Sequence, residues 1–208
     1  MEGSLILLSG GLDSSTLLLS VEDKNKHALI FKYGQPHEVE VEYAIKLCEE
    51  HGIEYTVHEF SLPSSGLLDS NSSTPVIQGR NATMISIGAA YAASLDRWGC
   101  LPGLANLYIA ANKDDQSLFP DCTPEFLDAM QAALVAGYGI NLQYPFIKKT
   151  KSEILELAWS LGLKTSDTWS CYDPVRKLFT DEVKECGLCL PCQQIREAYN
   201  TLKEKHND

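Results

Sequence analysis

The feature of this chain that most constrains its fold is a buried-type strand that ends abruptly in two glycines. Residues 4–8 read SLILL, Ser9-Gly10-Gly11 follow, and a helical pattern runs from Asp13 to Ser20. A short apolar run of this kind is typical of a strand buried in a parallel sheet, and Asp and Ser are favourable N-cap residues. The sequence therefore predicts a strand–loop–helix unit whose loop lies at the carboxyl edge of a parallel sheet.

The rest of the chain repeats this alternation. We expect further strands at 26–33, 54–60, 106–111 and 141–144, and helices at 37–51, 81–97, 123–137, 150–161 and from about Gln193. The pattern predicts an α/β fold, a Rossmann-like parallel sheet with helices on both faces. The alternation stops near residue 164, so we expect an α/β domain over residues 1–164 and a small cysteine-rich segment with a C-terminal helix over residues 165–208.

The loop after the first strand predicts a phosphate site. Two glycines let the backbone approach an anion closely, the helix start supplies amides and a favourable dipole, and Ser9, Ser14 and Ser15 add hydroxyl donors. The string contains neither a Walker A ending nor G-x-G-x-x-G. The alternative is a tight strand-to-helix turn with a good cap. The full string S-G-G-L-D-S resembles the PP-loop of the ATP pyrophosphatase superfamily, which implies cleavage of ATP between its α and β phosphates, with Mg²⁺.

Four of the seven cysteines gather near the C-terminus, at Cys171, Cys186, Cys189 and Cys192. Two C-x-x-C steps share Cys189, and thiolates at this spacing can converge on one tetrahedral Zn²⁺. Four thiolates leave no open coordination position, so the predicted zinc is structural. The alternatives are scattered buried cysteines, a disulfide or an iron–sulfur cluster.

Composition restricts the partners. The net charge is −11, with 28 acidic against 17 basic side chains, and binding to a nucleic-acid backbone needs clustered Lys and Arg. We therefore expect no nucleic-acid partner. The sequence has no apolar run long enough for a membrane span and no basic leader at its start, so we expect neither a membrane segment nor a signal peptide. Clustered cysteines without an export signal favour the reducing cytoplasm.

The loop and the cysteine array together resemble the 7-cyano-7-deazaguanine (preQ0) synthase family. Further strings agree with it: Tyr33-Gly34-Gln35 with His37 and Glu40, Gly79-Arg80-Asn81, Asp115, Ser117, Pro120-Asp121-Cys122, Lys151 and residues 168–172. The resemblance implies that ATP adenylates 7-carboxy-7-deazaguanine and that ammonia displaces AMP to give the amide. A second ATP then activates the amide oxygen, and loss of AMP leaves the nitrile. The resemblance also implies a homodimer.

Site residues follow from these motifs. For ATP we predict Leu8, Ser9, Gly10, Gly11, Asp13, Ser14, Ser15, Phe31, Tyr33 and Gln35. For the small-molecule substrate we predict His37, Arg80, Asn81, Asn112, Asp115 and Asp121, and for catalysis Asp13, Arg80 and Lys151. An arginine can pair with phosphates or a carboxylate, and a carboxylate can accept from the guanine-like N–H edge. Each assignment has a competing interpretation. The aromatic residues could simply pack in the core, and His37, Arg80 and Lys151 could be helix caps or solvated residues. The segment with Asn112, Asp115 and Asp121 could be a solvated acidic loop. The Glu-rich helix near 38–50 is interpreted as a solvated face.

Three other functions remain open. Leu118-Phe119 and Thr123 depart from the Gly-Tyr and Arg of the family pattern, which motivates a PP-loop ligase or amidase acting on a related deazapurine or another carboxylate. A tRNA sulfur transferase is a second possibility, disfavoured by the acidic balance and by the commitment of four cysteines to metal. A non-catalytic nucleotide-binding protein is the third, disfavoured by the intact loop.

Overall fold

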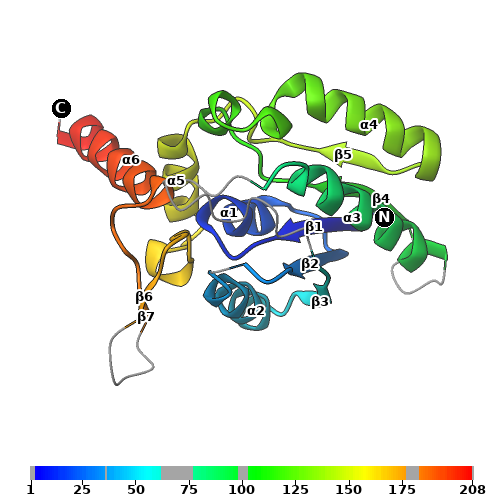
Figure 1. The fold of residues 1–208 in the computed structure, drawn as a ribbon, viewed down its shortest axis with the longest axis horizontal. Helices are drawn as coiled ribbons and strands as arrows, with labels where there is room; N and C mark the ends of the chain where they lie inside the picture. Colours follow the sequence, from blue (N-terminus) through cyan, green and yellow to red (C-terminus); the bar gives the residue numbers. More distant parts are fainter. Residues whose placement is uncertain (1–2, 36, 62–76, 98–102, 177–182, 208) are drawn as a thin grey trace.

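Five parallel strands form the centre of the computed structural model, which describes residues 3–35, 37–61, 77–97, 103–176 and 183–207 of the 208. The strands are β1 (Gly3–Leu8), β2 (Lys26–Lys32), β3 (Glu54–Glu59), β4 (Leu104–Tyr108) and β5 (Asn141–Gln143). Their order is β3-β2-β1-β4-β5, and Ile6 of β1 lies opposite Ala28 of β2 and Tyr108 of β4. The predicted parallel α/β sheet is confirmed (Figure 1).

Six α-helices surround the sheet. They are α1 (Leu12–Ser20), α2 (Val39–His51), α3 (Arg80–Arg97), α4 (Pro124–Tyr138), α5 (Lys151–Ser160) and α6 (Leu190–Asn207). Short 3₁₀ helices follow β4 at η1 (Asp114–Ser117) and η2 (Pro120–Cys122), and η3 (Thr165–Asp167) follows α5. A small antiparallel ribbon, β6 (Val175–Arg176) and β7 (Val183–Lys184), precedes α6. Both α4 and α5 begin at threonine N-caps, Thr123 and Thr150, whose side chains accept from the amides of Phe126 and Glu153.

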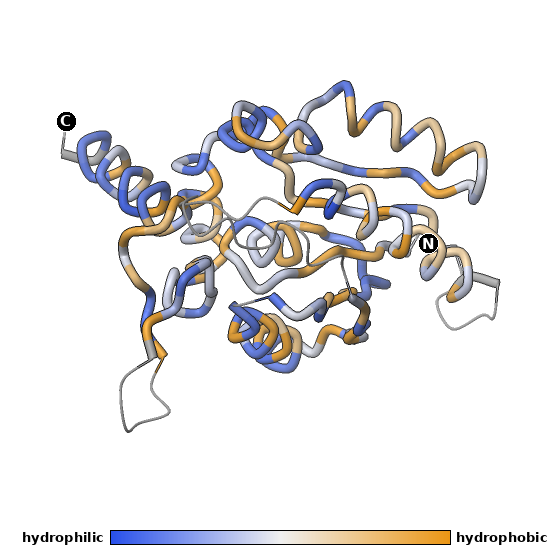
Figure 2. Tube along the Cα trace, viewed as in Figure 1, coloured by the Kyte–Doolittle hydropathy of each residue, from blue (hydrophilic) through white to orange (hydrophobic). Residues whose placement is uncertain are grey.

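The alternation of side chains along β1 divides the core into two. Ile6 and Leu8 pack with α1, α2, α5 and α6, whereas Leu5 and Leu7 pack with α3 and α4. Successive strand side chains point to opposite faces, so the apolar run at residues 5–8 supplies both cores. Helices therefore cover both faces, as predicted. Figure 2 shows hydrophobic residues along the central strands, whereas α6 is largely hydrophilic.

The structure departs from the predicted elements in a few places. The strand expected at 106–111 is Leu104–Tyr108, because its neighbour β5 ends at Gln143, whose carbonyl accepts the last ladder hydrogen bond from Ile109 at 2.9 Å. The ribbon β6–β7 and the 3₁₀ helices were not predicted. Residues 61–79, rich in Ser, Pro, Asn and Gly, predict a long loop, but residues 62–76 of it lie outside the described residues, as does Cys100.

The C-terminal helix belongs to the main core. Ala198 and Leu202 of α6 pack in the same cluster as Ile154 and Leu155 of α5. The division at residue 164 stays a prediction, and it does not separate two hydrophobic cores. Among the helices that the structure describes, none combines the length and apolar character needed to cross a membrane.

The turn after β1 depends on Gly10. Its φ is +91°, a conformation that residues with a Cβ rarely adopt. A Cβ at this position would lie 2.1 Å from the carbonyl oxygen of Glu40 and 3.0 Å from the amide nitrogen of Ala44. The backbone of α2 therefore packs directly against the loop, and only glycine allows that approach.

We predict that Gly10→Ala destabilises the protein far more than Gly52→Ala. Gly52, at the end of α2, also has a positive φ, +61°, but no atom lies within 4 Å of a Cβ built there. Gly52→Ala should therefore cost about 1–2 kcal/mol from the backbone alone. Gly10→Ala should cost at least ~2 kcal/mol more, because two rigid backbone segments must separate. Urea unfolding of the metal-loaded proteins measures both, and equal losses would contradict the packing argument.

Candidate functional site

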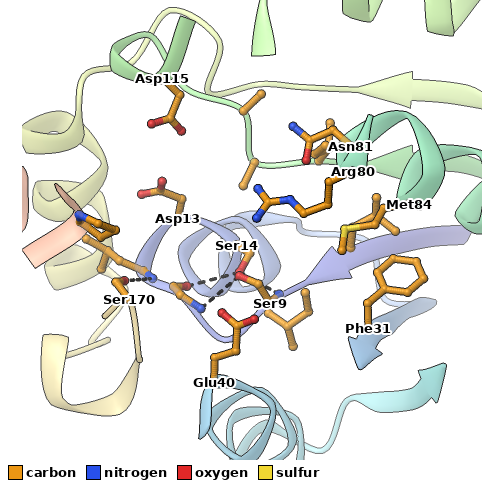
Figure 3. Close-up of a pocket in the computed structure, with 18 of the residues that line it drawn as sticks. Ser9, Asp13, Ser14, Phe31, Glu40, Arg80, Asn81, Met84, Asp115 and Ser170 are labelled. Atoms are coloured by element: carbon orange, nitrogen blue, oxygen red, sulfur yellow. Dashed lines mark hydrogen bonds between the residues drawn. The ribbon is translucent and has the colours of Figure 1, made fainter. Parts of the chain in front are cut away.

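A pocket lies at the carboxyl end of the sheet, where the strand order reverses between β1 and β4. Ligands of open α/β sheets bind at this switch point. Most of the predicted site residues line the pocket: Leu8, Ser9, Gly11, Asp13, Ser14, Phe31, Tyr33, His37, Arg80, Asn81, Asp115 and Lys151. The others are not among the residues that line the pocket: Gly10, Ser15, Gln35, Asn112 and Asp121. Figure 3 shows the arrangement.

The loop between β1 and α1 is held by its own hydroxyl groups. The amide of Ser9 donates to Ser14 Oγ at 3.1 Å, and the two serine hydroxyls lie 2.9 Å apart. The amide of Gly11 donates to Ser9 Oγ at 3.2 Å. Because α1 begins at Leu12, its first amides face the same pocket and have no partners within the helix. The loop thus presents the amide and hydroxyl groups that bind phosphate.

Opposite the loop, Asn112 links two carboxylates. Its side chain is fully buried, and Nδ2 donates to Asp13 Oδ2 at 2.9 Å and to Asp115 Oδ2 at 2.8 Å. Its Oδ1 accepts from the amides of Asp114 and Asp115 at 2.9 and 3.1 Å. The amide group is therefore fully engaged within the chain. Its assignment as a substrate contact stays a prediction.

Lys151 completes this group. Its Nζ lies 2.5 Å from Asp13 Oδ2, and its side chain is 12% exposed. Burial works against its charge, but Asp13 and Asp115 more than offset this and raise the pKa of Lys151 above its ordinary value. Burial also raises the pKa of Asp115 to about 6, although Lys151 acts in the opposite direction.

The two carboxylates suit a divalent cation. Asp13 Oδ1 is buried and has no hydrogen-bond partner among the described residues. Figure 3 shows the carboxylates of Asp13 and Asp115 facing one another across the pocket, beside the Ser9–Ser14 loop. Mg²⁺ is usually held by one or two carboxylates together with substrate phosphates, and this donor set fits that pattern.

A second buried group surrounds Arg80. Figure 3 shows its guanidinium group reaching from the start of α3 toward the loop. Burial works against its charge, but the neighbouring Tyr33, Tyr172 and Glu40 raise its pKa above its ordinary value. Burial, reinforced by the charge of Arg80, lowers the pKa of His37 to about 4, so this imidazole is neutral at pH 7.

Glu40 is the least expected member of this group. The helix that contains it was interpreted as a solvated face, but Glu40 is only 8% exposed and lines the pocket. Burial raises its pKa to about 8, even though Gln35 and Arg80 favour its charged form. Gln35 Nε2 donates to Glu40 Oε1 at 3.1 Å, and Gln35 Oε1 accepts from the amide of Tyr33 at 2.8 Å. Gln35 therefore braces the turn after β2; its contact with ATP stays a prediction.

Asn81 connects α3 to the segment after β4. Its backbone amide donates to Asp121 Oδ2 at 3.3 Å, and its Nδ2 donates to Cys122 Sγ at 3.3 Å. Burial raises the pKa of Cys122 to about 12, so the thiol is protonated at neutral pH. Cys122 is a wall of the pocket and a poor nucleophile.

The four C-terminal cysteines converge as predicted. Their sulfur atoms all lie within 4.8 Å of one another, with Cys189 Sγ 3.4 Å from Cys192 Sγ and 3.9 Å from Cys171 Sγ. Tetrahedral Zn–S bonds of about 2.3 Å place neighbouring sulfurs about 3.8 Å apart. Although burial disfavours the thiolate of Cys186, the amides of Leu188 and Cys189 donate to it and lower its pKa to about 7. This cysteine cage can hold a metal ion.

Comparison with known proteins places the chain in a family. A family model described as "Queuosine biosynthesis protein QueC" matches residues 3–203. The chain belongs to the QueC family. A 7-cyano-7-deazaguanine synthase from Caldicellulosiruptor bescii is 34% identical over 97% of this chain and 94% of its own length. A protein of the same name from Marinomonas sp. is 30% identical over 95% of this chain and 93% of its own length.

Solved structures agree on the fold. The U34-tRNA thiolase NcsA from Methanococcus maripaludis, with its [4Fe-4S] cluster, matches 99% of this chain and 67% of its own with a TM-score of 0.54. At 18% identity, this likeness is one of fold alone. The QueC-family chain thus shares its architecture with a protein of different description.

Several pocket residues of this QueC-family chain were missed by sequence reasoning. Besides Glu40, they include Trp169, Ser170 and Tyr172, which flank the first cage cysteine, and Pro191 and Gln194 of α6. The string 168–172 did match the family, which was a signal, but it was interpreted as the approach to the metal site. Because residues 168–172 lie far from the Ser9–Ser14 loop in the sequence, their proximity to it in the fold was not predicted.

We predict that Glu40→Gln makes stability less dependent on pH. The pKa of a glutamate is raised here from 4.5 to about 8, so the folded chain retains a proton that the unfolded chain releases. The free energy of unfolding should therefore fall as pH rises from about 4.5 to 8. Glu40→Gln should match the wild type near pH 5 and exceed it by on the order of 2–4 kcal/mol at pH 9.

Denaturant unfolding at a series of pH values measures this effect. Glu42, exposed on the same helix, is the matched control, and Glu42→Gln should follow the wild-type pH profile. If the free energy of unfolding fell equally with rising pH in Glu40→Gln and in the wild type, Glu40 would not be the group that retains the proton.

Proposed function

We propose that this protein is an ATP-dependent ligase that converts 7-carboxy-7-deazaguanine and ammonia into 7-cyano-7-deazaguanine. Membership of the QueC family over residues 3–203 and the names of full-length relatives support this proposal. The observation on which it rests is one pocket where the Ser9–Ser14 loop, with Asp13 at its end, lies together with Asp115, Lys151 and Arg80.

ATP is proposed to lie along the loop. The amides and hydroxyls of Ser9–Ser14 hold the pyrophosphate portion, and Phe31 and Tyr33 at the end of β2 flank the adenine or ribose. Arg80 and Lys151 offset the charge of the phosphates. Asp13 and Asp115 would hold Mg²⁺ between the carboxylates and the phosphates, where it would neutralise charge on the departing pyrophosphate.

The proposed chemistry needs orientation and charge stabilisation and no protein nucleophile. A carboxylate oxygen of the substrate attacks the α phosphorus, and pyrophosphate leaves into the loop. Ammonia then attacks the carbonyl carbon, AMP leaves with its bonding electrons, and a proton is released. In the second round the amide oxygen attacks the α phosphorus of another ATP and displaces pyrophosphate. The nitrogen then loses both of its protons while AMP leaves with the electrons of the C–O bond, and the nitrile remains. Holding the reactants in line supplies much of the rate enhancement in such a site.

Substrate contacts are assigned by position. Arg80 pairs with the substrate carboxylate, and Asp115 and Asn81 face the heterocycle from the β4 side of the pocket. Asn112 and Asp121 act through Asp115 and Asn81, which they hydrogen bond. The departures at 118–123 favour a different carboxylate only weakly, because Cys122 alone of this segment is among the residues that line the pocket, and Thr123 caps α4.

The remaining assignments are also proposals. The cage takes a structural Zn²⁺, because all four ligands are thiolates and they meet at tetrahedral distances. The net charge of −11 supports small-molecule partners over nucleic acid. Cytoplasmic location and a homodimer follow from the reduced cage cysteines and from the family resemblance. A tRNA sulfur transferase is disfavoured, because four of the cysteines are committed to the cage.

We predict that metal-loaded protein with Mg-ATP, ammonium and 7-carboxy-7-deazaguanine yields the nitrile, with pyrophosphate released at each activation step and AMP at the step that follows it. Mass spectrometry identifies the product. Lys151→Met should lower kcat by about 100-fold or more, because it removes a charge at the reacting phosphates. Ser166→Ala, on an exposed turn, is the control and should retain full activity. An amide that accumulates unchanged would mean an amidase, and no AMP at all would overturn the proposal.

We predict that the purified protein contains about one zinc per chain and no iron. Elemental analysis of protein purified without oxygen measures both, and visible absorption would reveal an iron–sulfur cluster. Cys189→Ser should lose the metal and melt at a lower temperature, because a structural zinc contributes its binding energy to folding. Cys48→Ala, a buried cysteine of α2, should keep the metal. Stoichiometric iron in the protein purified without oxygen would contradict the prediction and would mean that the cage holds an iron–sulfur cluster.

A further inference from the structure

The segment before the first cage cysteine makes direct contact with the phosphate loop. The amide of Trp169 donates to the carbonyl of Gly10 at 2.8 Å. The amide of Leu12, the first residue of α1, donates to Ser170 Oγ at 3.2 Å. These bonds join residues almost 160 positions apart along the chain, and Figure 3 shows the second as a dashed line.

Ser170 occupies a position suited to a phosphate ligand. Its Oγ lies at the N-terminus of α1 and would be 3.6 Å from a Cβ at Gly11, and its side chain lines the pocket. A serine hydroxyl that accepts from an amide still has its own proton to donate. Ser9 and Ser14 lie on one side of the loop and Ser170 on the other, so an anion seated on the loop amides meets hydroxyls from both.

The cage fixes the position of this hydroxyl. Cys171 is the next residue, is fully buried and is one of the four converging thiols. On the other side, the Trp169 ring is buried, with its centroid 5.6 Å from that of Tyr43 of α2, and its Nε1 donates to the carbonyl of Cys171 at 3.0 Å. The backbone on either side of Ser170 is therefore fixed, by the Trp169 ring packed on α2 and by the metal-binding thiol of Cys171.

We propose that Ser170 is a phosphate-binding residue of the nucleotide pocket and that the cysteine cage holds its hydroxyl against the loop. The ligand class is a di- or triphosphate, and the inference rests on the proposed use of ATP. The cage then has a role beyond holding the C-terminal segment in place. Because it positions Ser170, metal binding also sets the affinity of the loop for phosphate.

The probe is inorganic pyrophosphate with Mg²⁺, titrated calorimetrically into metal-loaded protein. Ser170→Ala should raise the dissociation constant by about 10- to 100-fold, the effect of one hydrogen bond to a charged group. Ser170→Thr keeps the hydroxyl and should bind within a few-fold of the wild type. Ser166→Ala is the matched control from the same segment and should bind as the wild type does. Metal content is measured for each protein.

Metal removal is the second arm. A chelator under reducing conditions should weaken pyrophosphate binding to the wild type at least as much as Ser170→Ala does. It should affect Ser170→Ala itself much less, because the hydroxyl that the cage positions is already missing. Unchanged affinity of the metal-free wild type would overturn the role of the cage.

The outcomes separate this inference from the proposed function. Equal binding by Ser170→Ala and the wild type would overturn the role of Ser170 and leave the ATP chemistry intact. Equal weakening in Ser170→Ala and Ser170→Thr would overturn the role of the hydroxyl. Failure of the wild type itself to bind pyrophosphate would overturn the proposed function together with the inference.

Discussion

The contact between Gly10 and the backbone of α2 is the constraint on which the geometry of the pocket depends. With no Cβ on Gly10, the loop lies directly against the first turns of α2, which places the Glu40 side chain within the pocket. The same turn leaves the carbonyl of Gly10 available to the amide of Trp169. One close approach between two backbones therefore positions the phosphate loop, the buried carboxyl group and the cysteine segment relative to one another.

The pocket contains the positive charges that an anionic ligand needs, although the protein as a whole is acidic. Arg80 and Lys151 bring positive charge into the pocket of a chain whose net charge is −11, and the carboxylates of Asp13 and Asp115 favour the charged form of Lys151. Asp13 and Asp115 would repel each other, but the neutral amide of Asn112 donates to both and lets them stay close. A buried network of this kind is stable only when its members are satisfied. Asp13 Oδ1 is buried without a hydrogen-bond partner among the described residues, and it faces the place proposed for the cation.

Local pattern predicted most of the fold, and tertiary contacts explain what it missed. The sequence predicted β1 and β2 because parallel strands covered on both faces are mostly apolar, and it predicted the loop and the cage because the spacing of their residues is short. The end of β4 depends on where β5 stops, which the sequence of β4 does not contain. Glu40 looked like its exposed neighbours on a Glu-rich helix, and Ser170 was hidden by its distance from the loop. Asn112 was predicted to contact the substrate, and its bridge between Asp13 and Asp115 depends on tertiary structure that the sequence does not contain.

The metal cage lies in a segment, residues 169–192, whose described part has few other contacts to hold it in place. Around it the structure describes only a small apolar cluster, built on Trp169, Cys171 and Cys189. So few buried groups cannot offset the conformational entropy of fixing a loop against a distant helix terminus. A metal that joins Cys171 to three cysteines at the start of α6 supplies that energy locally, and α6 in turn is anchored in the main core by Ala198 and Leu202. The cage thereby transmits the rigidity of the core to the residues that face the phosphate loop.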